Sequence, residues 1–123
     1  MKVTVSITKN FKSEVKPLLK KYKSLASDLL KLEKELLKNP RLGTPLGKDA
    51  YKIRLQISSK NKGKSGGGRI VSLVDSTLIG LSQHSIDGEI TVNLLSIYDK
   101  SDVATISDKE LRDLINNFLR THK

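Results

Sequence analysis

Three cations near the middle of the chain have the types and the spacing to hold a phosphate. Lys52 and Arg54 are two residues apart in the alternating segment YKIRLQI, which is typical of a strand, so both side chains leave one face about 6.5–7 Å apart. Arg69 begins the next segment with strand character, and its planar guanidinium can hold two phosphate oxygens at once. Together these residues predict a site for the phosphate backbone of a polyanion.

The basic charge of the chain is concentrated in two stretches. The formal net charge is +10 and the pI is near 9.9. Residues 48–69 carry seven basic residues against Asp49, and residues 9–23 carry six lysines against Glu14. Such focused charge favours a polyanionic partner, which could be nucleic acid, the ribosome, an anionic membrane surface or an acidic protein. A solubilising surface is the alternative for both stretches.

The composition argues against several classes of protein. The chain has no cysteine, so it has no disulfide and no thiolate metal site, which favours a reducing compartment. No apolar run approaches the roughly 20 residues that span a bilayer, and the first residues lack the apolar segment of a signal peptide. We therefore expect one cytoplasmic domain over residues 1–123, with no membrane contact. The segment Gly63–Gly67 is not a nucleotide-binding loop, because Ser58 occupies the position where that motif requires glycine.

The first half of the chain predicts one strand and two helices. Residues 3–7 alternate between apolar and polar, which is typical of a strand with one buried face. Apolar residues at helical spacing predict a helix over 11–22, capped by Asn10 and kinked or restarted at Pro17. A second helix over 25–37, capped by Ser24 or Ser27, ends at Asn39-Pro40. The short connection predicts an antiparallel helical hairpin.

The second half predicts mainly strands. Residues 41–49 are expected to form a Gly/Pro loop, and the strands are expected at 51–57, 69–75 and 89–98. Residues 77–85 either extend a strand or form an excursion, and Asp87-Gly88 predicts a hairpin turn. Ser107 and Glu110 form a capping box before a final helix. The expected fold is α+β, with a small antiparallel-rich sheet of about four strands, the N-terminal helical hairpin and a C-terminal helix, in the order β-α-α-β-β-β-α.

Five segments in this order carry a family resemblance. They are FKSEVKPLLKKY (Phe11–Tyr22), NPRLGTPLG (Asn39–Gly47), YKIRL (Tyr51–Leu55), GKSGGGRI (Gly63–Ile70) and LLSIYDK (Leu94–Lys100). The chain resembles the RelE/ParE/HigB toxin superfamily of type II toxin–antitoxin systems over about residues 5–119. The pattern G-K-S-G-G-x-R is closer to the HigB/RelE-like mRNA interferases.

The resemblance implies an endoribonuclease that cleaves mRNA without a metal or other cofactor. The ribose 2′-hydroxyl attacks the adjacent phosphorus and the 5′-oxygen leaves, so protons must move and phosphate charge must be held. The resemblance assigns this work to Lys52, Arg54, Arg69, Tyr98 and Lys100. Relatives often have lysines at both strand positions, and since Arg54 is a poor base, proton transfer shifts to Lys52 or elsewhere.

Further lysines are expected to contact the RNA backbone without sequence preference, in a salt-dependent way. They are Lys48, Lys60, Lys62 and Lys64. The two histidines, His84 and His122, are not expected to act as a base.

The resemblance also implies partners, namely mRNA, the ribosome and a cognate antitoxin with an acidic segment that folds over the basic groove. Two alternatives stay open: a ParE-like topoisomerase inhibitor on the same scaffold, and a non-catalytic nucleic-acid-binding domain. In the plainest alternative, Lys52 and Arg54 are ordinary exposed strand residues and Tyr98 is an aromatic residue that closes the core.

Overall fold

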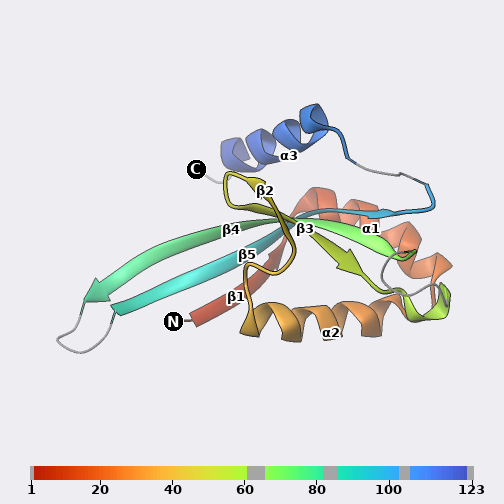
Figure 1. Cartoon of the computed structure of the whole chain (residues 1–123), viewed down its shortest axis with the longest axis horizontal. Coiled ribbons are helices and arrows are strands. Elements are labelled where there is room, and N and C mark those ends of the chain that lie inside the picture. The colour runs from red at the N-terminus through yellow and green to blue at the C-terminus, as the bar shows by residue number, and fades with distance from the viewer. Residues whose placement is uncertain (1, 61–65, 82–85, 103–105, 122–123) are drawn as a thin grey trace.

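A mixed β-sheet between two layers of helices forms the fold (Figure 1). The computed structural model describes residues 2–60, 66–81, 86–102 and 106–121. Its elements are β1 (Lys2–Ile7), α1 (Lys9–Lys21), α2 (Leu25–Lys38), β2 (Thr44–Gly47), β3 (Ala50–Leu55), the 3-10 turn η1 (Ser58–Lys60), β4 (Gly68–Leu81), β5 (Ile86–Asp99) and α3 (Asp108–Thr121). The predicted α+β class is confirmed, but the described residues form five strands rather than about four.

The strands lie in the order β1-β5-β4-β3-β2. β1 runs parallel to β5, and the other neighbouring pairs are antiparallel. β5 lies inside the sheet, as its apolar residues on both faces predict. The extra strand, β2, arises in the segment that was expected to be a loop. Its Pro45 is tolerated because β2 is an edge strand, where a missing N–H need not remove a ladder hydrogen bond.

β4 and β5 form a long antiparallel pair that extends past its neighbours. β3 pairs with β4 only as far as Leu73, and β1 pairs with β5 only from Glu89 onward. Beyond these residues β4 and β5 continue as a two-stranded ribbon to Leu81 and Ile86. The predicted hairpin turn at residues 87–88 is wrong, because both residues pair with β4 inside β5. The connection between the two strands falls on residues 82–85, outside the described residues.

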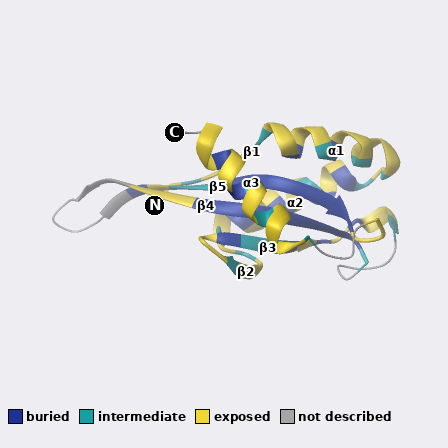
Figure 2. Cartoon of the chain, turned by 90° about the horizontal axis from the view of Figure 1, so that it is seen from above, coloured by how far each residue is buried: buried dark blue, intermediate teal, exposed yellow. Residues whose placement is uncertain are grey.

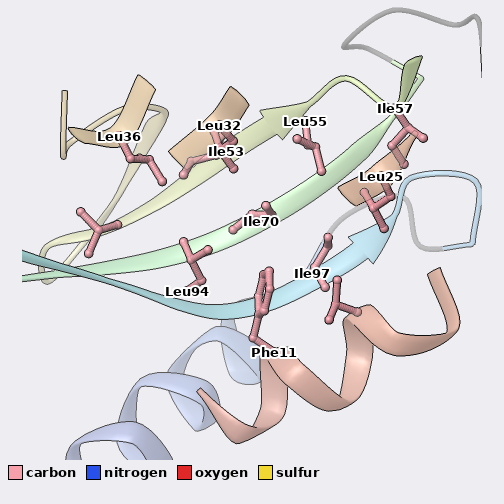
Figure 3. Close-up of a cluster of buried hydrophobic side chains, with 12 residues drawn as sticks. Phe11, Leu25, Leu32, Leu36, Ile53, Leu55, Ile57, Ile70, Leu94 and Ile97 are labelled. Atoms are coloured by element: carbon pink, nitrogen blue, oxygen red, sulfur yellow. The ribbon is translucent and has the colours of Figure 1, made fainter. Parts of the chain in front are cut away.

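Two apolar clusters join the helices to opposite faces of the sheet. On one face, α1 and α2 pack against the strands through residues that include Phe11, Leu25 and Ile70 (Figure 3). On the other face, α3 packs over Val71 and Leu95 through Ile115 and Phe118. α3 crosses only part of its face, and the ends of the central strands extend beyond it (Figure 2). None of the helices in the described residues has the length and apolar character to cross a membrane.

The helix ends follow local hydrogen bonding. α1 begins after Thr8, whose Oγ1 accepts from the Phe11 N–H at 3.1 Å, whereas the predicted cap, Asn10, donates to the Leu95 carbonyl at 2.9 Å. α1 continues through Pro17 without restarting. Ser24 is the N-cap residue of α2, although its side chain makes no capping hydrogen bond. Half of the predicted capping box before α3 is confirmed, since Ser107 Oγ accepts from the Glu110 N–H at 3.1 Å. The Glu110 carboxylate accepts from the same hydroxyl, at 3.0 Å, in place of the Ser107 N–H.

Candidate functional site

A row of two arginines and a tyrosine crosses three neighbouring strands. Arg54 on β3 lies directly opposite Arg69 on β4, and Arg69 lies directly opposite Tyr98 on β5. Directly opposed residues of an antiparallel pair project from the same face, and two strand spacings cover about 10 Å. The sheet therefore brings together three of the predicted site residues, which we call the arginine–tyrosine row.

Lys52 projects from the same face as the row, because it is two residues from Arg54 on β3. Its cross-strand partner is Val71, which belongs to the apolar cluster beneath α3. Lys52 is half-buried and Arg54 is exposed. Lys52 thus lies between the row and the part of the sheet that α3 covers.

Arg69 is buried in spite of its charge, with 4% of its surface exposed. Its Nη1 donates to the Gly68 carbonyl at 2.9 Å. Burial and the neighbouring Arg54 guanidinium lower the pKa of Arg69, and Tyr98 acts in the opposite direction. An arginine remains charged under such a shift, so two positive groups face one another across neighbouring strands.

Tyr98 closes the row at β5. Its hydroxyl is buried and has no hydrogen-bond partner among the residues that the structure describes. Burial raises the pKa of Tyr98; the Ile106 backbone and Arg69 lower it by less, and the Glu110 carboxylate adds a small increase. Tyr98 is therefore a neutral phenol at physiological pH, with a proton that it can donate to a ligand.

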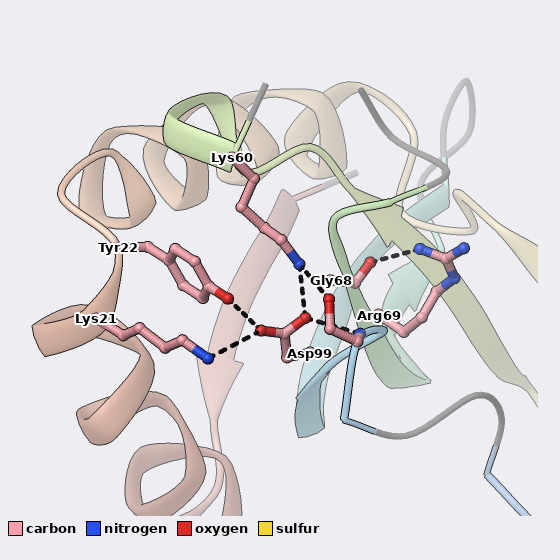
Figure 4. Close-up of polar contacts among 7 residues, drawn as sticks. Lys21, Tyr22, Lys60, Gly68, Arg69 and Asp99 are labelled. Carbon is pink, nitrogen blue, oxygen red and sulfur yellow. Dashed lines mark hydrogen bonds and ion pairs between the residues drawn. The ribbon is translucent and has the colours of Figure 1, made fainter. Parts of the chain in front are cut away.

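A buried carboxylate next to the row is the feature that sequence reasoning missed. The Asp99 side chain has no exposed surface; it accepts from Lys60 Nζ at 2.7 Å, from the Ser101 N–H at 2.9 Å and from the Tyr22 hydroxyl (Figure 4). Lys21 Nζ lies 3.9 Å from Asp99 Oδ2, the oxygen that accepts from Tyr22. Burial alone would raise the pKa of Asp99, but the hydrogen bonds from Lys60 and Tyr22 hold it well below its ordinary value. In the sequence, the only indication of this network is an aspartate at the end of an apolar strand. If that carboxylate is buried, it needs a cation as its partner.

The Asp99 network gives Lys60 a structural role. The Lys60 side chain is 7% exposed, and its ammonium donates to Asp99 and, at 2.9 Å, to Ser101 Oγ. A buried carboxylate needs a partner of opposite charge, and Lys60 supplies it. The network also fixes the end of α1, η1 and the end of β5 relative to one another.

The remaining predicted cations are dispersed. Lys100 is exposed in the turn after β5, where its N–H donates to the Gly67 carbonyl at 3.1 Å, close to the row. Lys48 lies in the β2–β3 turn, beyond Ala50 and so separated from Arg54 by more than about 13 Å of strand. Lys48 therefore does not join the row. The predicted residues Lys62 and Lys64 lie outside the described residues, as do both histidines.

Two cavities lie near these elements. The larger, about 490 Å³, opens between the start of α1 and α3, is lined by residues such as Ile7, Leu114 and Phe118, and includes none of the predicted site residues. The smaller, about 80 Å³, lies between α2 and β3 and has Arg54 in its lining. The row is therefore a feature of the open sheet face and not of the larger cavity.

No family model, no curated protein and no solved structure matches this chain.

Proposed function

We propose that this chain is the toxin of a type II toxin–antitoxin system, an endoribonuclease of the RelE/HigB kind that cleaves mRNA without a metal. The observation that carries the proposal is the arginine–tyrosine row, in which Arg54, Arg69 and Tyr98 are successive cross-strand partners. Two guanidinium groups beside a neutral phenol provide charge stabilisation and a proton donor within about 10 Å.

The proposed reaction is an internal transfer at phosphorus. The ribose 2′-oxygen forms a bond to phosphorus and the bond to the 5′-oxygen breaks, which leaves a 2′,3′-cyclic phosphate and a 5′-hydroxyl. Arg54 and Arg69 hold the charge on the non-bridging oxygens. The 2′ proton passes to the Lys52 amine, and Tyr98 donates a proton to the departing oxygen. Lys100, which is exposed in the turn after β5, contacts the phosphate next to the one that is cleaved.

The partners follow from the same proposal. The enzyme acts in the cytoplasm on mRNA, with the ribosome as the place of encounter, and a cognate antitoxin holds it inactive. A net charge of +10 suits an antitoxin with an acidic segment that covers the row. Expression without the antitoxin is expected to arrest growth.

The test is cleavage by the purified protein in the presence of a chelator. We expect cuts in mRNA on ribosomes, products that end in a 2′,3′-cyclic phosphate, and no cut where the nucleotide at the cut site is 2′-deoxy. Arg54→Gln should abolish most of the activity, while Lys48→Gln, which removes a similar exposed cation away from the row, should retain it. No cleavage by the wild type, or equal loss in both variants, would refute the assignment. A parallel assay with a type II topoisomerase tests the ParE-like alternative.

A non-catalytic RNA-binding domain is the second candidate. It is favoured by the burial of Arg69 and Tyr98, which limits how closely the substrate can approach them, and by an arginine at position 54, which leaves Lys52 as the only amine beside the row on β3. This candidate predicts binding of uncut RNA that depends on Arg54, without cleavage on or off the ribosome.

A further inference from the structure

One face of α1 carries four lysines in a line. Lys9, Lys12, Lys16 and Lys20 follow one another at steps of three or four residues, and all four are exposed. Residues at these steps share one face of a helix, and from first to last they cover about 16 Å. The opposite face of α1 is buried against the sheet through Phe11 and Val15. We call the four residues the lysine ridge.

The ridge is not neutralised within the described residues. The ion pairs found there all involve Asp99, and none includes a ridge lysine. Glu14 is the one acidic residue of α1, and its carboxylate accepts from Asn10 at 2.8 Å and from Ser96 of β5 at 2.7 Å, so it is directed toward the sheet. Like charges four residues apart destabilise a helix. The repulsion among the ridge lysines therefore destabilises α1.

The neighbouring helix, α2, shows that a solvent-exposed helix does not need a surface of positive charge alone. α2 is of similar length and exposes three lysines, Lys31, Lys34 and Lys38. It also carries three acidic residues, Asp28, Glu33 and Glu35, so its net charge is zero. If solubility were the only requirement, the mixture of acidic and basic residues on α2 would be sufficient. The single sign on α1 indicates a ligand with many negative charges.

The ridge and the arginine–tyrosine row lie on opposite sides of the sheet, because α1 packs on one face and the row projects from the face that carries α3. They approach each other at one end of the sheet. Directly after the ridge, Lys21 and Tyr22 contact Asp99, which follows Tyr98 on β5 and pairs with Gly68 beside Arg69 (Figure 4). The negative charge of Asp99 is balanced by Lys60, so it does not interrupt the basic path. One flexible chain of phosphates that contacts both surfaces would therefore pass around the end of the sheet, where Lys21 and Asp99 lie.

We propose that the lysine ridge is a second RNA-binding surface, which holds the phosphates that flank the segment at the row. The choice of RNA rests on the proposed function. An anionic membrane is the weaker candidate, because a helix that binds a membrane presents an apolar face to it, and the apolar face of α1 is packed on the sheet. Near the ridge the exposed large apolar residues among those described are Leu19 on α1 and Ile7, which precedes the helix.

The test measures how salt weakens binding to an RNA that cannot be cut. A 20-nucleotide single strand with 2′-O-methyl groups lacks the attacking hydroxyl, so binding is measured whether or not the chain is a nuclease. The ridge variant is Lys12→Gln, Lys16→Gln, Lys20→Gln, and the matched control is Lys31→Gln, Lys34→Gln, Lys38→Gln. Each lost phosphate contact removes about 0.7 from the slope of log affinity against log salt, so the ridge variant should lose about 2. The control should keep the wild-type slope.

Several outcomes would overturn the proposal: no binding by the wild type, equal slopes in wild type and ridge variant, or an equal loss in the control. Ridge-dependent binding to vesicles of anionic lipid, without ridge-dependent binding to RNA, would assign the surface to a membrane instead. The ridge variant should unfold at or above the wild-type temperature, which shows that lost binding is not lost folding. If the ridge changes the slope but the wild type never cuts RNA, the ridge stands and the nuclease proposal fails.

Discussion

Arg54 and Arg69 lie directly opposite each other on β3 and β4, so two guanidinium groups leave the same face of the sheet from neighbouring strands. Like charges at directly opposed positions are unfavourable, by an amount on the scale of other cross-strand pairs, roughly 0.2–1 kcal/mol. The repulsion between the two guanidinium groups is therefore a small cost to stability. Function and stability should respond in opposite directions when one partner is neutralised.

Arg54→Gln is expected to lower the cleavage rate about 10²–10³-fold, which is the effect of removing one preorganised donor to a developing charge. The free energy of unfolding should stay level or rise by a few tenths of a kcal/mol, roughly, because Arg54 is exposed and its repulsion of Arg69 is lost. Initial cleavage rates and urea unfolding of the same preparation measure both quantities. Arg120→Gln is the control, since Arg120 is exposed on α3 and donates to Asn117 of the same helix. A slow Arg54→Gln variant that is also strongly destabilised would contradict the argument.

Much of the fold could be predicted from periodicity. The alternation in residues 3–7 and 51–57 and the helical spacing in residues 11–37 correspond to β1, β3, α1 and α2, because each pattern places one apolar face on the core. The short strand β2 was missed, since Gly and Pro usually indicate a loop and a four-residue edge strand has no periodicity of its own. Asp87-Gly88 failed as a turn, because the pairing of β4 with β5 outweighs the local preference of two residues.

Part of the candidate site could also be predicted from the sequence, and part required the structure. The face shared by Lys52 and Arg54 follows from their spacing, and the alignment of Arg69 with both Arg54 and Tyr98 required the register of three strands. Lys60 could not be assigned from the sequence, because its partner, Asp99, is 39 residues away. The sequence of a basic loop does not distinguish a lysine that is exposed to solvent from one that forms a buried ion pair.

The turn between β2 and β3 gives a prediction that separates Lys48 from the site. Lys48 and Asp49 both have positive φ, at 55° and 63°, which the two central residues of a type I′ hairpin turn require. Non-glycine residues pay about 1–2 kcal/mol in this region, and Asn-Gly is the preferred pair. Lys48→Asn with Asp49→Gly should therefore stabilise the fold by about 1 kcal/mol in urea unfolding.

Cleavage by this turn variant should equal that of the wild type, because Lys48 lies beyond Ala50 and away from the row. The cleavage rates of the wild type and of the Arg54→Gln variant serve as the upper and lower references. A loss of activity that approaches that of Arg54→Gln would return Lys48 to the site.

The buried ion pair between Lys60 and Asp99 should dominate the stability of this end of the sheet. Asp99→Asn leaves the Lys60 ammonium buried without its counter-charge, which typically costs about 3–5 kcal/mol. Lys60→Met removes the other charge and keeps an unbranched side chain in place. The double variant should lose less stability than the two single variants summed, with a coupling of roughly 0.5–3 kcal/mol. Urea unfolding of the four proteins measures this coupling, and simple additivity would show that the two charges do not act together.

The same carboxylate should make stability depend on acid. In the unfolded chain Asp99 titrates near about 3.9, and in the folded protein its pKa lies well below that value, so the folded state binds the proton less readily. The stabilisation is complete above the unfolded pKa and is lost as the pH falls from about 5 toward the folded pKa. The pKa of Asp28 is also lowered, by hydrogen bonds from Ser24 and Ser58 that outweigh its burial, so it adds to the same trend. Between about pH 6 and pH 3, the urea midpoint of the wild type should therefore fall more steeply than that of Asp99→Asn, which keeps the Asp28 contribution. Parallel curves for the two proteins would show that Asp99 is not held ionised by Lys60 and Tyr22.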